Sequence, residues 1–526
     1  MASIIFITPT PPDISAFGVR SLSAFLRRAG HHTRLVFLPG SAGLLSEGGE
    51  FVYHYEEKII EQLIKLCKGF DFIGISFMTY YLDRAIQITQ AVKKNLNAPV
   101  IWGGIHATCK PEEALLYADM VCVGEGETAL AALLNGEKEV PGIWRKDELS
   151  VVQTGTAPLI KSLDSLPFFD FSNKDHFIFN PENMSVEPLT DSLFERALPL
   201  LPYHGSKLMR AFRIMTDRGC PHHCHYCNVP FIKRLYENGE IPYFRHRSVA
   251  NVIEELESVL VRFPFIKAIQ FFDDTFFARP MGWLTEFASS YRDRIRLPFY
   301  CQASPTTISR GKLDILIEAG MVYVEMGIQT GSKKVRFLYN RKETSQQIID
   351  SAKMIHAKLP RLLPPDYHVI IDSPWENRDD LFETILLLRQ IPKPFGLAIA
   401  SLVLFPGTEL YRRALADRLI NDELKEIARR PFYIAPKKSY MHFLLYLLTF
   451  QHVPDWLSNI LLKDHIIKFC ESRELSGFYK TAYIAGEAIR FADKGLRAIV
   501  RGDLNRIFSF LKRQRIKDPV VAGRKA

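Results

Sequence analysis

The sequence predicts an α/β protein in which two sheets of parallel strands follow one another and a helical region comes last. Short apolar runs alternate with amphipathic stretches of helical length through most of the 526 residues. This pattern is typical of parallel sheets whose strands are linked by crossover helices. Glycines and small polar residues gather where the apolar runs end, and parallel sheets bind ligands at the carboxyl ends of their strands. A hydrophobic content of 47% and a charged content of 24% are those of an ordinary soluble protein.

The first sheet is expected within residues 1–140. Its first helix is predicted by four apolar residues at helical spacing, Val19, Leu22, Phe25 and Leu26. In chain order, strands are expected at 4–7, 32–38, 71–77, 99–102 and 120–123, and helices at 17–28, 55–67 and 85–95. This order predicts a doubly wound, Rossmann-like sheet. Candidate ligand contacts at its strand ends are Ser76, Thr79, Gly103, Gly104, Gly124 and Gly126. The alternative is that the glycines only make the tight turns that such folds need.

A second series of strands and helices is expected at 206–415, after an irregular linker at 141–205. The linker is predicted from a loss of periodicity and from its prolines, Pro141, Pro158, Pro167, Pro181, Pro188, Pro199 and Pro202. The later strands are expected at 212–216, 268–272, 298–304, 321–329, 367–372 and 396–404. Six such strands predict a partial (β/α)6 barrel with its active site at the C-terminal strand ends. Residues 416–526 are expected to be helical.

The loop after the first barrel strand carries three cysteines at the spacing C-x3-C-x2-C, in the run Arg218-Gly219-Cys220-Pro221-His222-His223-Cys224-His225-Tyr226-Cys227. Iron–sulfur clusters are held by cysteine thiolates, normally four of them. Three thiols in one loop therefore suggest a 4Fe–4S cluster with one iron open to a small molecule. The alternatives are disulfides or a zinc site, which His222, His223 and His225 could complete.

This motif resembles that of the radical S-adenosylmethionine (SAM) superfamily. The resemblance implies that Cys220, Cys224 and Cys227 hold the cluster and that its open iron binds the amino and carboxylate groups of SAM. An electron from the cluster would then cleave SAM to methionine and a 5′-deoxyadenosyl radical. The resemblance also implies contacts to SAM or substrate at later strand ends, by Asp273, Asp274, Gln302, Ser304, Glu325 and Gln329. For the two aspartates, the alternative role is a helix N-cap.

The order of elements before the cysteine loop resembles the cobalamin-binding domain that precedes many radical SAM domains. In that family the motif D-x-H-x-x-G follows the first strand, and its histidine binds cobalt. Asp13 and Gly18 match the motif, but Ser15 stands in the place of the histidine, and a hydroxyl is a poorer cobalt ligand than imidazole. We therefore expect cobalamin to bind without a histidine on its lower face, near Ser15 and His106. The alternatives are a domain that has lost its cofactor and, for His106, an ordinary hydrogen bond at a strand end.

Cysteine usage and the chain start predict a cytoplasmic protein. The cysteines outside the motif are isolated, as expected for buried thiols in a reducing compartment, namely Cys67, Cys109, Cys122, Cys301 and Cys470. The start lacks the basic region of a signal peptide, and no apolar run is long enough to span a bilayer. The formal net charge of +9 permits an anionic partner without requiring one.

The C-terminal region combines an apolar stretch at 442–450 with a basic end, which contains Arg506, Lys512, Arg513, Arg515 and Lys517. This combination permits a peripheral membrane contact. A solvated helix face and a lid over the substrate are the alternatives.

These features and the resemblance predict a radical SAM enzyme that uses cobalamin to methylate an unactivated carbon. The expected substrate is a small molecule, such as a lipid or secondary-metabolite precursor, and the expected electron donor is a flavodoxin or ferredoxin. A nucleic acid is not expected as a partner, because methylthiotransferases of RNA carry further cluster cysteines and a C-terminal β-barrel. The alternatives are a radical cyclase, an enzyme that rearranges a carbon skeleton, and a non-catalytic cobalamin or iron–sulfur sensor. Catalytic residues are not predicted.

Overall fold

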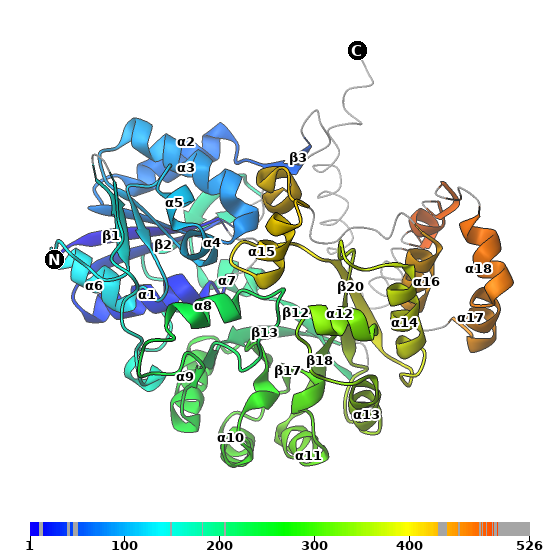
Figure 1. Cartoon of the computed structure of the whole chain (residues 1–526). Coiled ribbons are helices and arrows are strands. Elements are labelled where there is room, and N and C mark those ends of the chain that lie inside the picture. The colour runs from blue at the N-terminus through cyan, green and yellow to red at the C-terminus, as the bar shows by residue number, and fades with distance from the viewer. Residues whose placement is uncertain are drawn as a thin grey trace.

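The computed structural model describes residues 1–9, 14–38, 43–45, 51–147, 150–180, 182–204, 207–429, 439–450 and 453–472, and also 475, 477–479, 481–486, 488 and 492. It contains two large sheets with helices packed on them and a smaller group of helices after the second sheet. In Figure 1 the first sheet is blue to cyan, the second is green to yellow, and the last helices are orange. The predicted fold class is confirmed.

The first sheet is doubly wound, with the strand order β11-β10-β2-β1-β5-β6-β7-β8-β9. Its central strands are parallel, and they are β1 (Ser3–Thr8), β2 (His32–Phe37), β5 (Phe72–Ser76), β6 (Val100–Gly103) and β7 (Met120–Cys122). A short separate hairpin pairs β3 (Gly43–Leu45) with β4 (Phe51–Tyr53).

Helices cover both faces of this sheet. Ile4 and Phe6 of β1 pack into one core, whereas Ile5 and Ile7 pack into the other. The first core includes α1 (Phe17–Arg28) and α6 (Glu127–Leu134), and the second includes α2 (Glu57–Cys67), η1 (Thr79–Tyr81), α3 (Leu82–Asn95), α4 (Ile105–Cys109) and α5 (Pro111–Ala114). Since a strand buried on both faces has no polar side, its sequence is a continuous apolar run.

The segment 141–205, expected to be an irregular linker, instead supplies strands to both sheets. It contains β8 (Ile143–Lys146), β9 (Val151–Val152), η2 (Leu163–Ser165), β10 (Phe177–Asn180), β11 (Ser185–Pro188), α7 (Asp191–Ala197) and β12 (Leu200–Pro202). β8 pairs with β7, β10 pairs with β2, and β12 pairs with β13. These strands have two to four residues, too few for a periodic pattern, and β10 pairs with a strand about 140 residues earlier, since Phe177 lies opposite Val36.

The second sheet is a curled half-barrel with the order β12-β13-β16-β17-β18-β19-β20. Its six parallel strands are β13 (Leu208–Ile214), β16 (Ala268–Phe271), β17 (Phe299–Ala303), β18 (Met321–Gln329), β19 (Asp366–Ile371) and β20 (Gly396–Ser401). Each corresponds to a strand expected from the sequence. The helices along its outer side in Figure 1 are α9 (Val249–Arg262), α10 (Met281–Arg294), α11 (Arg310–Ala319), α13 (Ser345–His356) and α14 (Arg378–Leu388).

The C-terminal region continues with α15 (Glu409–Ala416), η6 (Leu424–Ala428), α16 (Tyr440–Leu448), α17 (Asp455–Leu461) and α18 (Asp464–Glu471). Met441 and Leu445 of α16 are fully buried against the core of the half-barrel. In the part of the chain that the structure describes, no helix is long and apolar enough to cross a membrane. The basic residues expected at the end, Arg506 to Lys517, lie outside the described residues.

Buried ion pairs join the two sheets where the cysteine loop begins. Arg218 forms ion pairs with Glu125 (Nη1 to Oε2, 3.1 Å) and Glu127, both of which follow β7. The hydroxyl of Ser21 on α1 donates to Glu127 Oε1 (2.6 Å). Burial raises the pKa of Glu127, but the charge and hydrogen bonds of Arg218 and the Ser21 hydroxyl outweigh it, so the pKa lies below the usual value.

Replacing Glu127 by glutamine is expected to lower the free energy of unfolding by about 2 kcal/mol at neutral pH. The loss is smaller than that of a fully broken buried pair, because Arg218 keeps its ion pair with Glu125. The Glu127 carboxylate stabilises the fold above about pH 5, and this contribution is lost as the pH falls through its lowered folded-state pKa.

Urea unfolding between pH 7 and pH 3.5 measures both effects. The difference between Glu127→Gln and the unchanged protein should be largest at pH 7 and should narrow in acid. Glu137→Gln, at an exposed position, is the matched control. It should change neither the free energy of unfolding at pH 7 nor the dependence of that energy on pH. Equal stability of the Glu127→Gln variant and the unchanged protein at pH 7 would show that the ion pair does not hold the sheets together.

Candidate functional site

The cysteine loop lies at the carboxyl end of the second sheet. Cys220, Cys224 and Cys227 fall between β14 (Asp217–Arg218) and α8 (Val229–Leu235). Gly219 has a φ of 89°, and a Cβ atom there would lie 2.8 Å from the ring of Tyr243. The loop therefore turns in a way that only glycine permits. The N–H of Cys227 donates to the carbonyl oxygen of Cys224 (3.1 Å), which closes the turn between these two thiols.

The donor set of the loop fits an iron–sulfur cluster. Burial raises the pKa of the Cys220 and Cys227 thiols to about 12, so they need a bound metal to become thiolates. Among the described residues, no three His, Cys, Asp or Glu side chains converge on a point where one metal ion could sit. A cluster has a different requirement, since each of its thiolates binds a different iron.

The three histidines of the loop make other interactions. His222 Nε2 hydrogen-bonds with the hydroxyl of Ser304 (2.9 Å), and His223 Nε2 accepts from Lys233 Nζ (2.9 Å). The ring of His225 donates from Nδ1 to the carbonyl oxygen of Leu338 (2.8 Å). These contacts leave the three thiols as the donor set of the loop, which favours a cluster with one open iron over a zinc site.

Arg341 is a candidate functional residue that the sequence analysis missed. Its Nη1 lies 3.9 Å from Cys224 Sγ and 3.5 Å from the hydroxyl of Tyr226, and its Nη2 donates to the carbonyl oxygen of Gly327 (2.6 Å). A buried cation beside a cluster ligand stabilises the negative charge that thiolates bring. Arg341 and Cys224 are 117 residues apart, and nothing in the local sequence indicates that they meet.

The two aspartates after β16 have different environments. Asp273 Oδ1 accepts hydrogen bonds from the backbone N–H groups of Thr216 (2.6 Å) and Asp217 (2.8 Å). Its other oxygen, Oδ2, lies 3.1 Å from Nη2 of the buried Arg279. Asp273 therefore ties the end of β16 to the start of the cysteine loop. Since all these partners belong to the protein, a contact between Asp273 and SAM stays a prediction without support here.

Asp274 lies beside the thiols. Its charge raises the pKa values of both Cys220 and Cys227, which places it within electrostatic reach of the loop. Asp274 is solvent-exposed, and partial desolvation by the surrounding chain together with the neighbouring charge of Asp273 raises its pKa. Among the described residues, no hydrogen bond or ion pair of its side chain is found. A carboxylate in this position suits an ammonium group bound next to the cluster.

The other predicted SAM contacts lie at different depths of the half-barrel. Ser304 lies at the strand ends and contacts the cysteine loop through His222. Gln329 ends β18 with a φ of 67°. Gln302 donates to Glu325 (3.2 Å), and burial raises the pKa of Glu325. Glu325 lies four residues before Gln329, about 13 Å along the strand, so it faces the inside of the half-barrel, below the edge that carries the cysteines.

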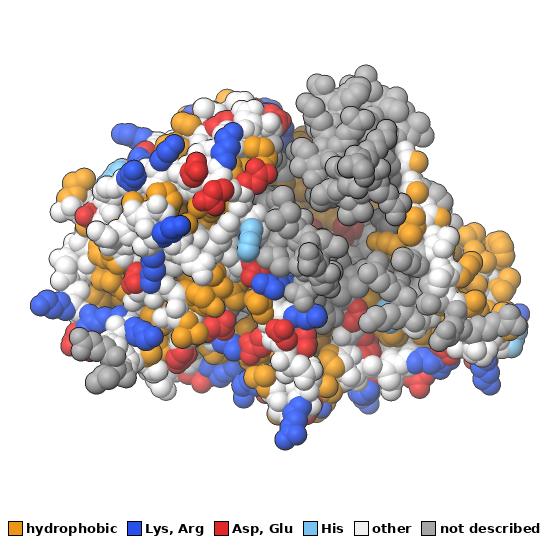
Figure 2. Space-filling view, turned by 90° about the horizontal axis from the view of Figure 1, so that it is seen from above, with side chains coloured by type: hydrophobic (Ala, Val, Ile, Leu, Met, Phe, Trp, Pro, Cys, Tyr) orange, Lys and Arg blue, Asp and Glu red, His pale blue; other side chains and the backbone are white. Residues whose placement is uncertain are grey.

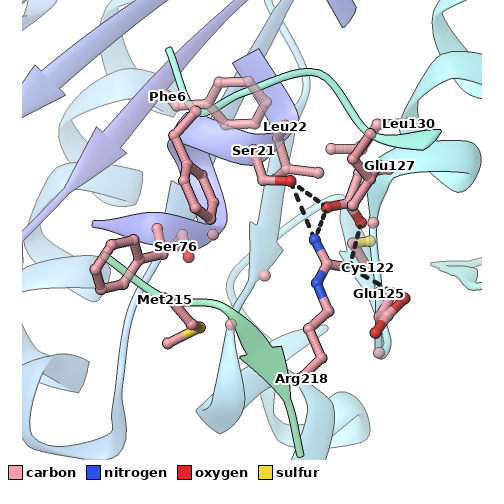
Figure 3. Close-up of a pocket in the computed structure, with 18 of the residues that line it drawn as sticks. Phe6, Ser21, Leu22, Ser76, Cys122, Glu125, Glu127, Leu130, Met215 and Arg218 are labelled. Atoms are coloured by element: carbon pink, nitrogen blue, oxygen red, sulfur yellow. Dashed lines mark hydrogen bonds and ion pairs between the residues drawn. The ribbon is translucent and has the colours of Figure 1, made fainter. Parts of the chain in front are cut away.

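A cavity of about 280 Å³ lies between the carboxyl end of the first sheet and the start of the cysteine loop (Figure 3). We call it the slot. Its walls come from α1 and α6, its floor from the central strands, and its far end from residues 215–218. Five of the strand-end residues expected to bind a ligand line it, namely Ser76, Gly103, Gly104, Gly124 and Gly126. Figure 3 shows Arg218 reaching from the cysteine-loop side toward Ser21 and Glu127.

Two glycines keep the slot open. A Cβ atom on Gly18 would meet no atom within 4 Å, and one on Gly103 would meet only Cys122, at 3.9 Å. Neither backbone has a positive φ, so neither position requires glycine for its conformation. Gly18 lies within α1, where glycine costs about 1 kcal/mol relative to alanine. The space that these glycines leave fits a flat, largely apolar group, as the dimethylbenzimidazole base at the end of the tail of a bound cobalamin would be.

Ser15, Thr79 and His106 do not line the slot. Ser15 is buried. His106 is 2% exposed and hydrogen-bonds through Nδ1 with the hydroxyl of Thr79 (3.3 Å), while its Nε2 has no partner among the described residues. Burial and the charge of Lys110 lower the pKa of His106 to about 4, so its ring is neutral. The structure thus shows the hydrogen bond that we considered for His106, and the second ring nitrogen is buried away from the slot.

Comparisons with known proteins agree with this architecture. The family model of the Radical SAM superfamily matches residues 214–388, and that of the B12 binding domain matches residues 4–134. An uncharacterized methyltransferase of Pyrococcus horikoshii is 26% identical over 380 residues, which cover 69% of this chain and 74% of that protein.

Two solved structures share the fold. TsrM, a radical SAM methyltransferase from Kitasatospora setae with cobalamin and a 4Fe–4S cluster bound, has a TM-score of 0.59 at 15% identity. That match covers 79% of this chain and 78% of TsrM. OxsB, a cobalamin-dependent SAM radical enzyme with aqua-cobalamin bound, has a TM-score of 0.56 at 18% identity, over 80% of this chain and 56% of OxsB. The two family models therefore identify a domain of the radical SAM superfamily at residues 214–388 and a B12-binding domain ahead of it, at residues 4–134.

Proposed function

We propose that this protein is a cobalamin-dependent methyltransferase that uses SAM radical chemistry on an unactivated carbon of a small molecule. The observation that carries the proposal is the position of Arg218. This residue lies two positions before Cys220, and its guanidinium reaches the carboxylates that line the slot. The cluster site and the cobalamin site are therefore adjacent, as an enzyme needs when both cofactors act on one substrate.

The chain has separate groups for each cofactor. Cys220, Cys224 and Cys227 would hold the cluster, with Arg341 beside Cys224 as a neutralising cation. Asp274 would accept the SAM ammonium group. On the cobalamin side, the slot would take the base at the end of the tail. When bound, the cluster supplies the electron that cleaves SAM, and cobalamin supplies the methyl group.

Methyl transfer is favoured over ring formation or carbon-skeleton rearrangement because the relatives reported above include proteins named as methyltransferases. The apolar side chains exposed on the last helices support a lipid or another apolar precursor as the substrate and contact with a membrane surface. They gather at the right of Figure 2 and include Trp456, Ile460, Phe469 and Phe478. A flavodoxin or ferredoxin would supply the electron. A non-catalytic sensor remains the second candidate, since it would bind the same cofactors.

Product analysis tests this function. The protein is reconstituted without oxygen with iron, sulfide and hydroxocobalamin, and SAM and a low-potential reductant are added. We expect 5′-deoxyadenosine from radical cleavage and S-adenosylhomocysteine from methyl transfer, the latter only when cobalamin is present. Cys224→Ala should abolish 5′-deoxyadenosine formation and lower the iron content, whereas Cys470→Ala, distant from the loop in sequence, should do neither.

The outcomes separate the candidates. Cobalamin retention without either product would favour the sensor. Formation of 5′-deoxyadenosine without cobalamin-dependent S-adenosylhomocysteine would contradict methyl transfer and favour a cyclase or a rearranging enzyme.

Asparagine substitutions at the two neighbouring aspartates should affect different properties, SAM binding at Asp274 and stability at Asp273. Asp274→Asn is expected to weaken SAM binding at least tenfold without a change in stability, because a neutral amide replaces the proposed partner of the ammonium group. Asp273→Asn is expected to cost roughly 3 kcal/mol of stability, because a buried acceptor of backbone N–H groups and of Arg279 is lost. Equilibrium dialysis with radiolabelled SAM and thermal unfolding measure the two effects. If Asp274→Asn binds SAM like the unchanged protein, the ammonium contact is wrong.

A further inference from the structure

The slot has an apolar body and a polar end whose groups bind one another. Its body is lined by Phe6, Leu22, Ile101 and Leu130, with the buried thiol of Cys122. Burial raises the pKa of this thiol to about 12, so it is uncharged. At the polar end lie Ser21, Glu125, Glu127 and Arg218, which Figure 3 shows joined by dashed lines.

Most hydrogen-bonding groups of this polar end are bound to one another. Glu127 Oε1 accepts from the hydroxyl of Ser21 (2.6 Å) and from Arg218, and Oε2 accepts from Arg218 Nη1 (3.3 Å). Glu125 accepts from both Arg218 and Arg245. Beyond this end, the hydroxyls of Ser76 and Tyr243 also line the slot, and no side-chain hydrogen bond of either is found among the described residues. A polar group that enters the slot therefore meets these two hydroxyls and otherwise a largely apolar wall.

From this arrangement we infer that the slot selects the corrinoid by the base at the end of its tail, taking an apolar benzimidazole and rejecting an adenine. The inference rests on the proposed cobalamin function and adds a preference between corrinoids. An adenine brings an exocyclic amino group and additional ring nitrogens into the apolar body. Two hydroxyls cannot pair all of these groups, so some would lose their hydrogen bonds with water and gain none, whereas the methyl groups of a dimethylbenzimidazole gain from burial.

Leu22 is the residue that best tests the selection. It projects from α1 into the slot, where its Cδ2 would lie 3.2 Å from a Cβ atom on Gly126. It is only partly buried, so a polar replacement is tolerated better here than at Ile101 in the core. Glutamine at this position offers both a donor and an acceptor to an adenine. Methionine keeps the volume and the apolar character, and it is the matched control.

Three corrinoids distinguish the outcomes: cobalamin with its dimethylbenzimidazole, the adeninyl cobamide, and cobinamide, which has no nucleotide tail. The cluster-loaded full-length protein is titrated with each corrinoid without oxygen, and binding is followed by visible absorption and equilibrium dialysis. We expect cobalamin to bind at least tenfold more tightly than the other two. Leu22→Gln should reduce severalfold the ratio of the affinity for cobalamin to the affinity for adeninyl cobamide. Leu22→Met should leave this ratio unchanged. Because this ratio compares two ligands on one variant, partial unfolding does not alter it.

Failure of this inference is distinguishable from failure of the proposed function. Equal affinities for cobalamin and the adeninyl cobamide would overturn the selection and leave the cobalamin function standing. Binding of cobinamide as tight as that of cobalamin would show that the tail does not enter the slot, and would also overturn it. If none of the three corrinoids binds to the cluster-loaded protein, the selection and the proposed function are both wrong.

Discussion

The guanidinium of Arg218, placed between Glu125 and Glu127, is the interaction on which the relation between the two cofactor sites depends. A buried ion pair adds little net stability, because both charges lose their hydration. Its geometry is restrictive, however, since each oxygen must meet a particular N–H group. Arg218 belongs to the short strand just before the cysteines, and the two glutamates follow the last parallel strand of the first sheet. The carboxyl ends of the two sheets therefore face each other across a few hydrogen bonds.

A second set of contacts holds the cysteine loop from its other side. The segment 405–410 follows the last barrel strand, and its Pro406 carbonyl oxygen accepts from the Asn228 side chain (2.6 Å). The N–H of Leu410 donates to the carbonyl oxygen of His225 (3.1 Å). Gly407 lies so close to Cys109 of the first domain that a Cβ atom would be 2.8 Å from its sulfur. The loop is thus fixed between the end of the barrel and the first domain, and a rigid loop keeps the open iron in one orientation.

Neighbouring residues at the strand ends divide the structural and chemical tasks. The carboxylate of Asp273 binds backbone N–H groups and Arg279, which leaves Asp274 as the carboxylate beside the thiols. On the first sheet, Glu125 and Glu127 alternate with Gly124 and Gly126, so that charges bind the second domain while the glycines leave room for a ligand. In each case one residue holds the structure together, and its neighbour leaves room or a functional group for what binds there.

The sequence alone determined most strands and helices of the two sheets, and it predicted Cys220, Cys224 and Cys227 as the cluster ligands. Periodicity is a local property, and the spacing of three cysteines within one loop is local as well, so both could be predicted without a structure. The strands at 143–146 and 177–180 were missed because hydrogen bonds to distant strands, and no local pattern, make them strands. The same reason hid Arg341, which reaches Cys224 across 117 residues, and the slot, whose walls come from both domains. Only the tertiary structure could decide between Asp273 and Asp274, because adjacent residues of one type differ in nothing but the groups that folding brings to them.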